Sequence, residues 1–291
     1  MGSGPFSPAK SPDTRLGIVL RIVFFIAAVL TCMIGLETLL VYTFGVFVAA
    51  TIGLFTAGLL GNLLTLKIFD ARPLTDIGLG GGLGWPRNFI LGVVFGAGAA
   101  ALLLVAPLMA GTGHLSARQN SSFSWGTVLF YLIAALFSAA GEEMIFRGYA
   151  FQLLVEKIGP FATVLPIGVL FGLAHSMNPH ASQLGVVNTI LWGILLGFAF
   201  LRSRDLWLPI GLHYGWNVVV PLFGAALSGL TIDVTRYSYQ WDLAPVWSGG
   251  AYGPEGGLLA TLFIVTLFFA VARAPIVPQR AAIAQILNEP A

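Results

Sequence analysis

The sequence predicts an all-α fold, a polytopic transmembrane helical bundle of about eight spans. Hydrophobic residues make up 57% of the 291 positions and charged residues only 9%, and the mean hydropathy is +0.89. Soluble domains are typically about 45–50% apolar. Several long stretches contain no charged residue, and an apolar run of about 20 residues is the usual signature of a membrane-spanning helix. These observations exclude a soluble globular domain.

The chain divides into one membrane domain and two tails. We predict a single transmembrane domain over residues 15–275. Residues 1–14 are polar and rich in proline, serine and glycine, which predicts a disordered tail, and residues 276–291 form a C-terminal tail. No cleavable signal peptide is expected, because the first apolar run, from about Leu16, is long enough to span. Cys32 is the only cysteine, which rules out an internal disulfide and a cysteine-rich metal cluster.

The apolar runs define the individual spans. In chain order we expect spans over residues 16–36, 39–64, 89–110, 125–157, 160–176, 184–202, 208–228 and 257–273. Gly159-Pro160 is a strong turn signal between the fourth and fifth runs. The fourth run is longer than a perpendicular crossing requires at about 1.5 Å per residue. We therefore expect it to tilt or to extend beyond the bilayer.

The basic residues predict the orientation of the bundle, since lysine and arginine favour cytoplasmic loops. If the N-terminus is cytoplasmic, ten of these residues fall in cytoplasmic segments and two, Arg118 and Arg236, fall on the other side. The ten are Lys10, Arg15, Lys67, Arg72, Arg87, Lys157, Arg202, Arg204, Arg273 and Arg280. Both termini are therefore predicted to be cytoplasmic.

Three ionisable residues lie close together within the fourth apolar run: Glu142, Glu143 and Arg147. Each would cost roughly 2.5–3.5 kcal/mol at the centre of a bilayer, so the cluster requires pairing or hydration. The i,i+4 spacing lets Glu143 and Arg147 meet on one helix face, while Glu142 can face a cavity. From these residues alone, a structural ion cluster and a transport path both remain open.

Two histidines in later runs could join this cluster. His175 follows the Gly159-Pro160 turn by about as many residues as Glu142 precedes it, so a helical hairpin would place the two side by side. His213 and Asn217, four residues apart, share one helix face. His213 lies near the start of its run and His175 near the end of its own, so straight full-length spans would separate them. Either a span is short or broken, or His213 does not join the site, and we favour the former.

The residue types in this set limit its chemistry. A carboxylate and an imidazole that share a water molecule can act as a general base, and a histidine beside an amide can stabilise a developing oxyanion. Together these groups suit hydrolysis of a peptide or an ester. Alternatively, Glu142, His175 and His213 could bind a divalent metal such as zinc with one position open for water.

The order and spacing of these residues resemble a known family. The motifs are Glu-Glu-x-x-x-Arg at 142–147, Phe-x-x-x-His at 171–175 and His-x-x-x-Asn at 213–217. Together they are similar to the three motifs of the CPBP family, which contains the CAAX prenyl endopeptidases of the Ras-converting type and bacterial relatives called abortive-infection proteins. The resemblance covers about residues 125–220.

This resemblance implies an intramembrane endopeptidase that hydrolyses a peptide bond of a membrane-associated or prenylated substrate. The roles that it implies are water activation by Glu142 with His175 as partner, oxyanion stabilisation by His213 and Asn217, and support from Glu143 and Arg147. It also implies a multi-pass protein, which we expect in a bacterial inner membrane. The expected partners are the lipid bilayer and a peptide or lipidated protein, and nothing indicates nucleic acid.

The resemblance leaves two questions open. Family members are described both as metalloproteases and as metal-free enzymes. We favour the metal-free version, because Asn217 is a poor zinc ligand, while zinc at Glu142, His175 and His213 remains the alternative. Because a fold can be reused without its activity, a non-catalytic bacteriocin-immunity factor or scaffold is the second alternative. A proton-coupled transporter is the third, because intramembrane carboxylates and histidines also occur in such proteins.

Overall fold

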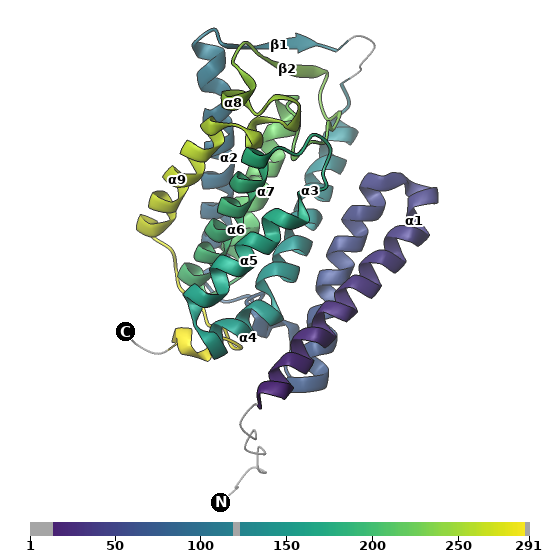
Figure 1. The fold of residues 1–291 in the computed structure, drawn as a ribbon, viewed down its shortest axis with the longest axis vertical. Coiled ribbons are helices and arrows are strands. Elements are labelled where there is room, and N and C mark those ends of the chain that lie inside the picture. The colour runs from purple at the N-terminus through teal and green to yellow at the C-terminus, as the bar shows by residue number, and fades with distance from the viewer. Residues whose placement is uncertain (1–13, 119–122, 289–291) are drawn as a thin grey trace, which may run out of the picture.

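The computed structural model describes residues 14–118 and 123–288, so the predicted N-terminal tail lies outside the described residues except for Thr14. Helices form one elongated bundle, and a two-stranded sheet lies at one of its ends (Figure 1). The first helix begins, and the last described segment ends, at the opposite end of the bundle. The fold is an α-helical transmembrane bundle, as predicted, with a small sheet that the sequence did not suggest.

The sheet joins the two segments that were predicted to lie on the side opposite to the termini. Strand β1 (Gly113–Ala117) pairs antiparallel with strand β2 (Tyr237–Trp241), with Leu115 opposite Tyr239. The Tyr239 hydroxyl donates a hydrogen bond to the Leu104 carbonyl at 2.6 Å. Burial raises the pKa of this phenol to about 12, so it remains a donor at neutral pH. The two-stranded sheet is thereby fixed to helix α2 (Trp85–Met109).

Helix α1 (Arg15–Thr65) is a helical hairpin. Gly45 interrupts it with φ 77° and ψ 167°, a conformation that glycine adopts without steric cost, and the two arms lie side by side (Figure 1). A β-carbon on Gly61 would lie 2.5 Å from Cγ2 of Val29, so the arms are in close contact.

The predicted boundary between the first two spans, at residues 37–38, is wrong. The chain turns at Gly45 instead, and Glu37 continues the first arm as a half-buried residue whose side chain lies against Gly53. Glutamate is a good helix former, so one glutamate between two apolar runs does not end a helix. A glycine with positive φ, by contrast, commonly ends a helix.

Helices α2 (Trp85–Met109) and α7 (Trp207–Leu222) pack at close range through glycines. The glycines at the contact are Gly92 and Gly96 on α2 and Gly211 and Gly215 on α7. A β-carbon on Gly96 would lie 2.0 Å from the Leu212 carbonyl oxygen. Small residues four positions apart commonly allow membrane helices to approach each other in this way. The contact fixes the position of α7, which carries His213.

We expect Gly96→Ala to destabilise the bundle, because the added methyl group would overlap the Leu212 carbonyl and push α2 away from α7. Overpacking of this kind costs about 1–3 kcal/mol. Gly98→Ala is the matched control, since a β-carbon at Gly98 on the same helix meets no atom within 4 Å. Thermal unfolding in detergent measures both variants, and equal unfolding midpoints would contradict the close contact.

The predicted fourth span, residues 125–157, is divided into two helices at Gly148. They are α3 (Trp125–Arg147) and α4 (Tyr149–Ile158). Asn62, buried on the second arm of α1, stabilises the break: its amide nitrogen donates to the Met144 carbonyl at 2.9 Å, and its Oδ1 accepts from the Tyr149 N–H at 2.7 Å. The long apolar run is therefore accommodated by a break and not by one straight helix.

The remaining elements complete the bundle. They are α5 (Pro160–Ala174), α6 (Gln183–Ser203), α8 (Pro245–Ser248), α9 (Leu258–Arg273), the π turn η1 (Leu66–Asp70) and the 3-10 segments η2 (Leu74–Ile77), η3 (Gly250–Tyr252), η4 (Pro254–Gly256) and η5 (Gln285–Asn288). Helix α7 ends at Leu222, whereas the predicted span continued to residue 228. Gly224, with φ 74°, turns the chain after this helix.

Within the described residues, four helical stretches are long and apolar enough to cross a membrane. They are Arg15–Asp70, Trp85–Met109, Trp125–Ile158 and Gln183–Ser203, and the first of these contains both arms of the α1 hairpin. Helices α5 and α9 have only 15 and 16 residues, so they rise about 22–24 Å against a hydrocarbon core of about 30 Å. The number of eight spans stays a prediction.

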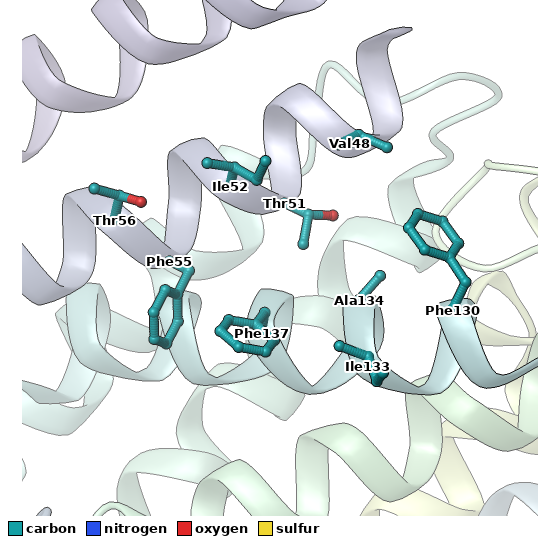
Figure 2. Close-up of a pocket in the computed structure, with 9 residues that line it drawn as sticks. All are labelled: Val48, Thr51, Ile52, Phe55, Thr56, Phe130, Ile133, Ala134 and Phe137. Carbon is teal, nitrogen blue, oxygen red and sulfur yellow. The ribbon is translucent and has the colours of Figure 1, made fainter. Parts of the chain in front are cut away.

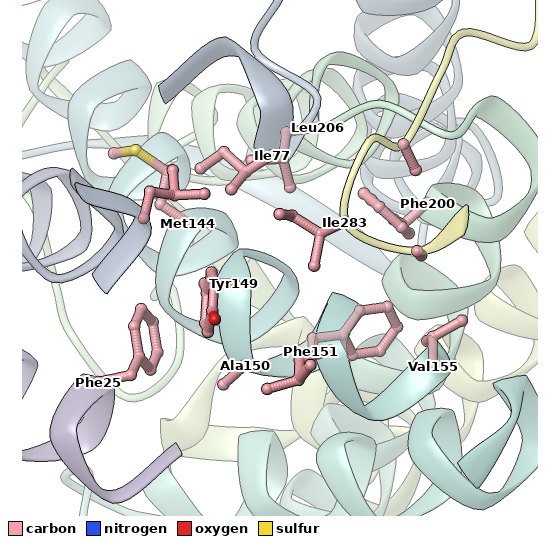
Figure 3. Close-up of a cluster of buried hydrophobic side chains, with 14 of the residues drawn as sticks. Phe25, Ile77, Met144, Tyr149, Ala150, Phe151, Val155, Phe200, Leu206 and Ile283 are labelled. Atoms are coloured by element: carbon pink, nitrogen blue, oxygen red, sulfur yellow. The ribbon is translucent and has the colours of Figure 1, made fainter. Parts of the chain in front are cut away.

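Buried apolar side chains fill the bundle around α4. Figure 3 shows Met144, Tyr149, Phe151, Phe200 and Ile283 among them. Ile283 belongs to the predicted C-terminal tail, residues 276–291, and the described part of this segment packs against the helices. The Gln279 N–H, for example, donates to the Ser203 carbonyl at 2.7 Å.

Candidate active site

The last turns of α3 carry the three ionisable residues that the sequence singled out. Glu143 and Arg147 are fully buried, and Nη1 of Arg147 donates to Oε1 of Glu143 at 3.1 Å. Nη2 of the same guanidinium donates to the Gly193 carbonyl of α6 at 2.7 Å, and its central carbon lies 4.7 Å from the centre of the Phe171 ring of α5. The i,i+4 pair that the sequence predicted is therefore confirmed, and it connects α3 with α5 and α6.

Glu143 also holds His213, which comes from α7. Nδ1 of His213 lies 3.0 Å from Oε1 of Glu143. Because a carboxylate only accepts hydrogen bonds, Nδ1 is the donor in this contact, and the proton is assigned from that partner. Glu143 thus binds Arg147 and orients the imidazole of His213 with the same oxygen.

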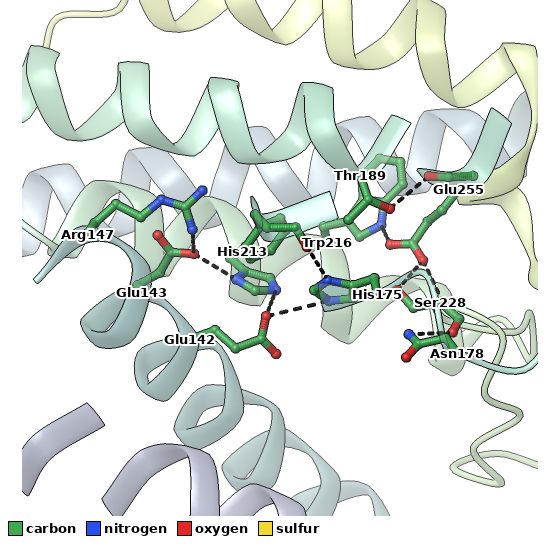
Figure 4. A network of polar contacts seen from close by, with 12 residues as sticks. Glu142, Glu143, Arg147, His175, Asn178, Thr189, His213, Trp216, Ser228 and Glu255 are labelled. Carbon is green, nitrogen blue, oxygen red and sulfur yellow. Dashed lines mark hydrogen bonds and ion pairs between the residues drawn. The ribbon is translucent and has the colours of Figure 1, made fainter. Parts of the chain in front are cut away.

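Glu142 lies between the two histidines, as Figure 4 shows. Its Oε2 is 3.8 Å from Nε2 of His175 and 4.0 Å from Nε2 of His213, and this oxygen has no hydrogen-bond partner among the described residues. Nδ1 of His175 donates to the Phe171 carbonyl at 2.8 Å, so Nε2 is the nitrogen that faces Glu142. One carboxylate oxygen and two imidazole nitrogens therefore face one small space.

The short helix α5 explains how the two histidines reach the same depth. Its 15 residues rise only about 22 Å, and it crosses the bundle obliquely (Figure 1). His175, the residue that caps its C-terminus, therefore stays inside the bundle, where it meets the second turn of α7. The expectation of a short span is confirmed, and His213 joins Glu142 and His175.

Asn217 lies one turn beyond His213 on α7. Its backbone carbonyl accepts a hydrogen bond from the Tyr131 hydroxyl at 2.6 Å. Its side chain is half-buried, and within the described residues it makes no hydrogen bond to Glu142, Glu143 or either histidine. The oxyanion-stabilising role expected of this amide therefore remains a prediction.

One buried carboxylate near the site was not singled out by the sequence analysis. Glu255, in η4, accepts hydrogen bonds from Nε1 of Trp216 at 2.9 Å and from the N–H and hydroxyl of Ser228 at 2.5 and 2.7 Å. It belongs to a glycine-rich segment that was predicted to lie outside the bilayer, where an acidic residue is common. The only available signal was the absence of any basic residue between Arg236 and Arg273.

An apolar groove with a volume of about 330 Å³ lies between the second arm of α1 and helix α3 (Figure 2). Its walls are Val48, Thr51, Ile52, Phe55 and Thr56 on α1 and Phe130, Ile133, Ala134 and Phe137 on α3. None of these residues is charged. Phe137, in the α3 wall, precedes Glu142 by five positions on the same helix.

The three predicted metal ligands have suitable chemistry but are not spaced as a metal site. A hydrogen bond at each Nδ1 leaves Nε2 of His175 and His213 to bind a metal. Around tetrahedral zinc, with bonds of about 2.0–2.2 Å, neighbouring ligand atoms lie roughly 3.3 Å apart, whereas Oε2 of Glu142 is 3.8 and 4.0 Å from the two nitrogens. Among the described residues, no group of three or more His, Cys, Asp or Glu could hold a metal ion. The three donor atoms are therefore farther apart here than zinc ligands are, and metal binding at this site stays a prediction.

Fold and site together define a membrane-embedded helical protein in which two glutamates and two histidines, buried or half-buried, converge inside the bundle. Residues 124–219, which contain all three motifs, match the family model of the Rce1-like Type II CAAX prenyl endopeptidases. This segment, about a third of the chain, is therefore similar to the CAAX-type intramembrane proteases.

One curated protein is also similar to part of this chain. It is "Putative membrane peptidase YdiL" of Bacillus subtilis (strain 168), which is 29% identical over 92 residues. The aligned part is 32% of this chain and 36% of the relative, so the chain matches only about a third of the relative's length. No solved structure matches the chain.

Proposed function

We propose that the protein is an endopeptidase that hydrolyses a peptide bond of a membrane-associated or lipidated substrate, with both of its termini in the cytoplasm of a bacterial cell. The observation that carries the proposal is the convergence of Glu142, His175 and His213 on one space (Figure 4). The match to the family model supports a peptidase site formed by these residues, since all three lie within the matched segment.

In the proposed mechanism, Glu142 activates a water molecule. Separations of 3.8 and 4.0 Å between its Oε2 and the two imidazole nitrogens suit groups that share one water molecule rather than a direct hydrogen bond. Glu142 removes a proton from the water, whose oxygen attacks the scissile carbonyl, and then returns a proton to the leaving amine. His175 holds the water in place through Nε2.

His213 and Asn217 form the proposed oxyanion-stabilising pair. Glu142 and Glu143 carry two negative charges and Arg147 one positive charge, so a protonated His213 would balance the buried cluster. Such a ring donates from Nδ1 to Glu143 and still has Nε2–H for the oxyanion. The Asn217 side chain makes no hydrogen bond within the cluster and can donate a second one.

The apolar groove supports a substrate that carries a hydrocarbon chain or a membrane helix. The groove contains no charged residue, and Phe137 in its α3 wall precedes Glu142 by five positions on the same helix. Two reporter peptides that differ only in a prenyl group on a cysteine test this proposal with protein purified in detergent. We expect faster cleavage of the prenylated peptide. Equal cleavage of both, or preference for the soluble peptide, would contradict the substrate class.

Metal removal is expected to leave the activity intact. The donor atoms lie farther apart than zinc ligands do, which supports a metal-free mechanism, and the proposed mechanism takes its base and its oxyanion donors from side chains. Elemental analysis of the purified protein, with activity measured before and after dialysis against a chelator, provides the check. A stoichiometric metal whose removal abolishes cleavage, and whose return restores it, would overturn the metal-free mechanism.

A further inference from the structure

Glu255 is a buried carboxylate that belongs to none of the three motifs and lies outside the segment matched by the family model. Its exposed fraction is 7%. Oε1 accepts from the Trp216 indole, and Oε2 accepts from both the N–H and the hydroxyl of Ser228. These donors are all neutral. A buried carboxylate held in this way loses much of its hydration, so its retention requires a structural or functional reason.

On one side, Glu255 fixes the turn that follows His175. Ser228 has φ 48°, a left-handed conformation that is unfavourable for a residue other than glycine and that its two hydrogen bonds to Glu255 hold in place. The Ser228 carbonyl accepts from the Asn178 side chain at 3.1 Å, and the Asn178 N–H donates to the His175 carbonyl at 3.1 Å. A β-carbon on Gly229 would lie 1.9 Å from the Pro179 carbonyl oxygen, so the two turns are in direct contact.

On the other side, Glu255 fixes the helix that carries His213. Trp216 lies three positions after His213 on α7 and is almost fully buried, with its ring 4.9 Å from that of Trp192 on α6. The backbone around Glu255 is itself anchored to α6, because the Asn188 side chain donates to the Glu255 carbonyl at 2.7 Å. Glu255 is therefore held rigidly between α6, α7 and the turn after α5.

We propose that Glu255 is a positioning residue that sets the separation of His175 and His213 about Glu142. It joins the two histidines by one continuous path, through Trp216 to α7 and through Ser228 and Asn178 to the end of α5 (Figure 4). A carboxylate is required because both of its oxygens accept hydrogen bonds. A glutamine would turn its NH₂ group toward one of the donors and break the path on that side.

Hydrogen–deuterium exchange of Glu255→Gln tests the structural part, which does not depend on peptidase activity. We expect faster exchange of the amides in residues 174–180 and 226–230, with the α2 helix unchanged. Tyr239→Phe is the control, since it removes a buried hydrogen bond to Leu104 at the same end of the bundle without touching this path. Exchange at residues 174–180 that equals the wild type would overturn the inference.

Steady-state cleavage tests the kinetic part, which rests on the proposed function. Small displacements of catalytic groups can cost about 100-fold in rate, so we expect Glu255→Gln to lower kcat about 10- to 100-fold per folded molecule and KM less than threefold. Tyr239→Phe should keep its kcat.

The two experiments separate the two proposals. Normal kcat in Glu255→Gln would reject the positioning role. An inactive wild-type protein whose Glu255→Gln variant nevertheless exchanges faster at residues 174–180 would reject the peptidase function and leave the structural link between Glu255 and this turn in place.

Discussion

Glu142→Gln is expected to abolish peptide cleavage while the protein remains folded. A positioned general base contributes about 10²- to 10⁴-fold to rate, and glutamine keeps the shape of the side chain but cannot take a proton from water. Oε2 of Glu142 has no hydrogen-bond partner among the described residues, and its contacts with His175 and His213 are as long as 3.8 and 4.0 Å, so we expect the variant to stay folded. The measurement is kcat in detergent or liposomes, with the thermal unfolding midpoint measured on the same preparation.

Glu37→Gln is the matched control for this prediction. Glu37 is also a half-buried glutamate within an apolar helix, but it lies on the first arm of α1 against Gly53. We expect this variant to cleave at the wild-type rate. If Glu142→Gln cleaved as fast as Glu37→Gln, water activation by Glu142 would be excluded.

The largest expected effect on stability is that of Arg147→Met. Removal of one partner of a buried ion pair typically costs about 3–5 kcal/mol, because the other charge is left buried without compensation. Here the substitution leaves Glu143 fully buried, and it also removes the hydrogen bond to the Gly193 carbonyl and the contact of the guanidinium with Phe171. Unfolding in detergent, by heat or by denaturant, measures the loss.

Two further variants test whether the loss of stability comes from the unpaired buried charge of Glu143. Asp76→Asn breaks a more exposed i,i+4 pair with Arg72, and such pairs are worth at most about 1 kcal/mol. The double variant Glu143→Leu/Arg147→Met removes both buried charges and should regain part of the stability, but it should stay inactive because His213 loses its Nδ1 partner. A stable Arg147→Met variant, or an active double variant, would contradict the role of the pair.

The local features of the site were predictable because they depend on helix geometry alone. The i,i+4 spacing gave the contact between Glu143 and Arg147, and equal distances from the Gly159-Pro160 turn gave the meeting of Glu142 with His175. The position of His213 was harder to predict, because it depends on the length and tilt of α5 and on the glycine contact between α2 and α7, which are tertiary properties.

Other features could not be read from hydrophobic patterns. The turn at Gly45 occurs within a continuous apolar run, so hydropathy gives no boundary there. Strands β1 and β2 are short and lie about 120 positions apart in the chain, and their pairing depends on the helices that bring them together. Glu255 becomes important only when Trp216 and Ser228 meet it in the folded protein.

The most direct test of this account is mass spectrometry of a membrane-peptide reporter incubated with the wild-type protein, with Glu142→Gln and with Glu37→Gln in liposomes. The account predicts two fragments whose masses together exceed that of the reporter by one water molecule, formed by the wild type and by Glu37→Gln and not formed by Glu142→Gln. An intact reporter in all three samples, or the same fragments in all three, would contradict it.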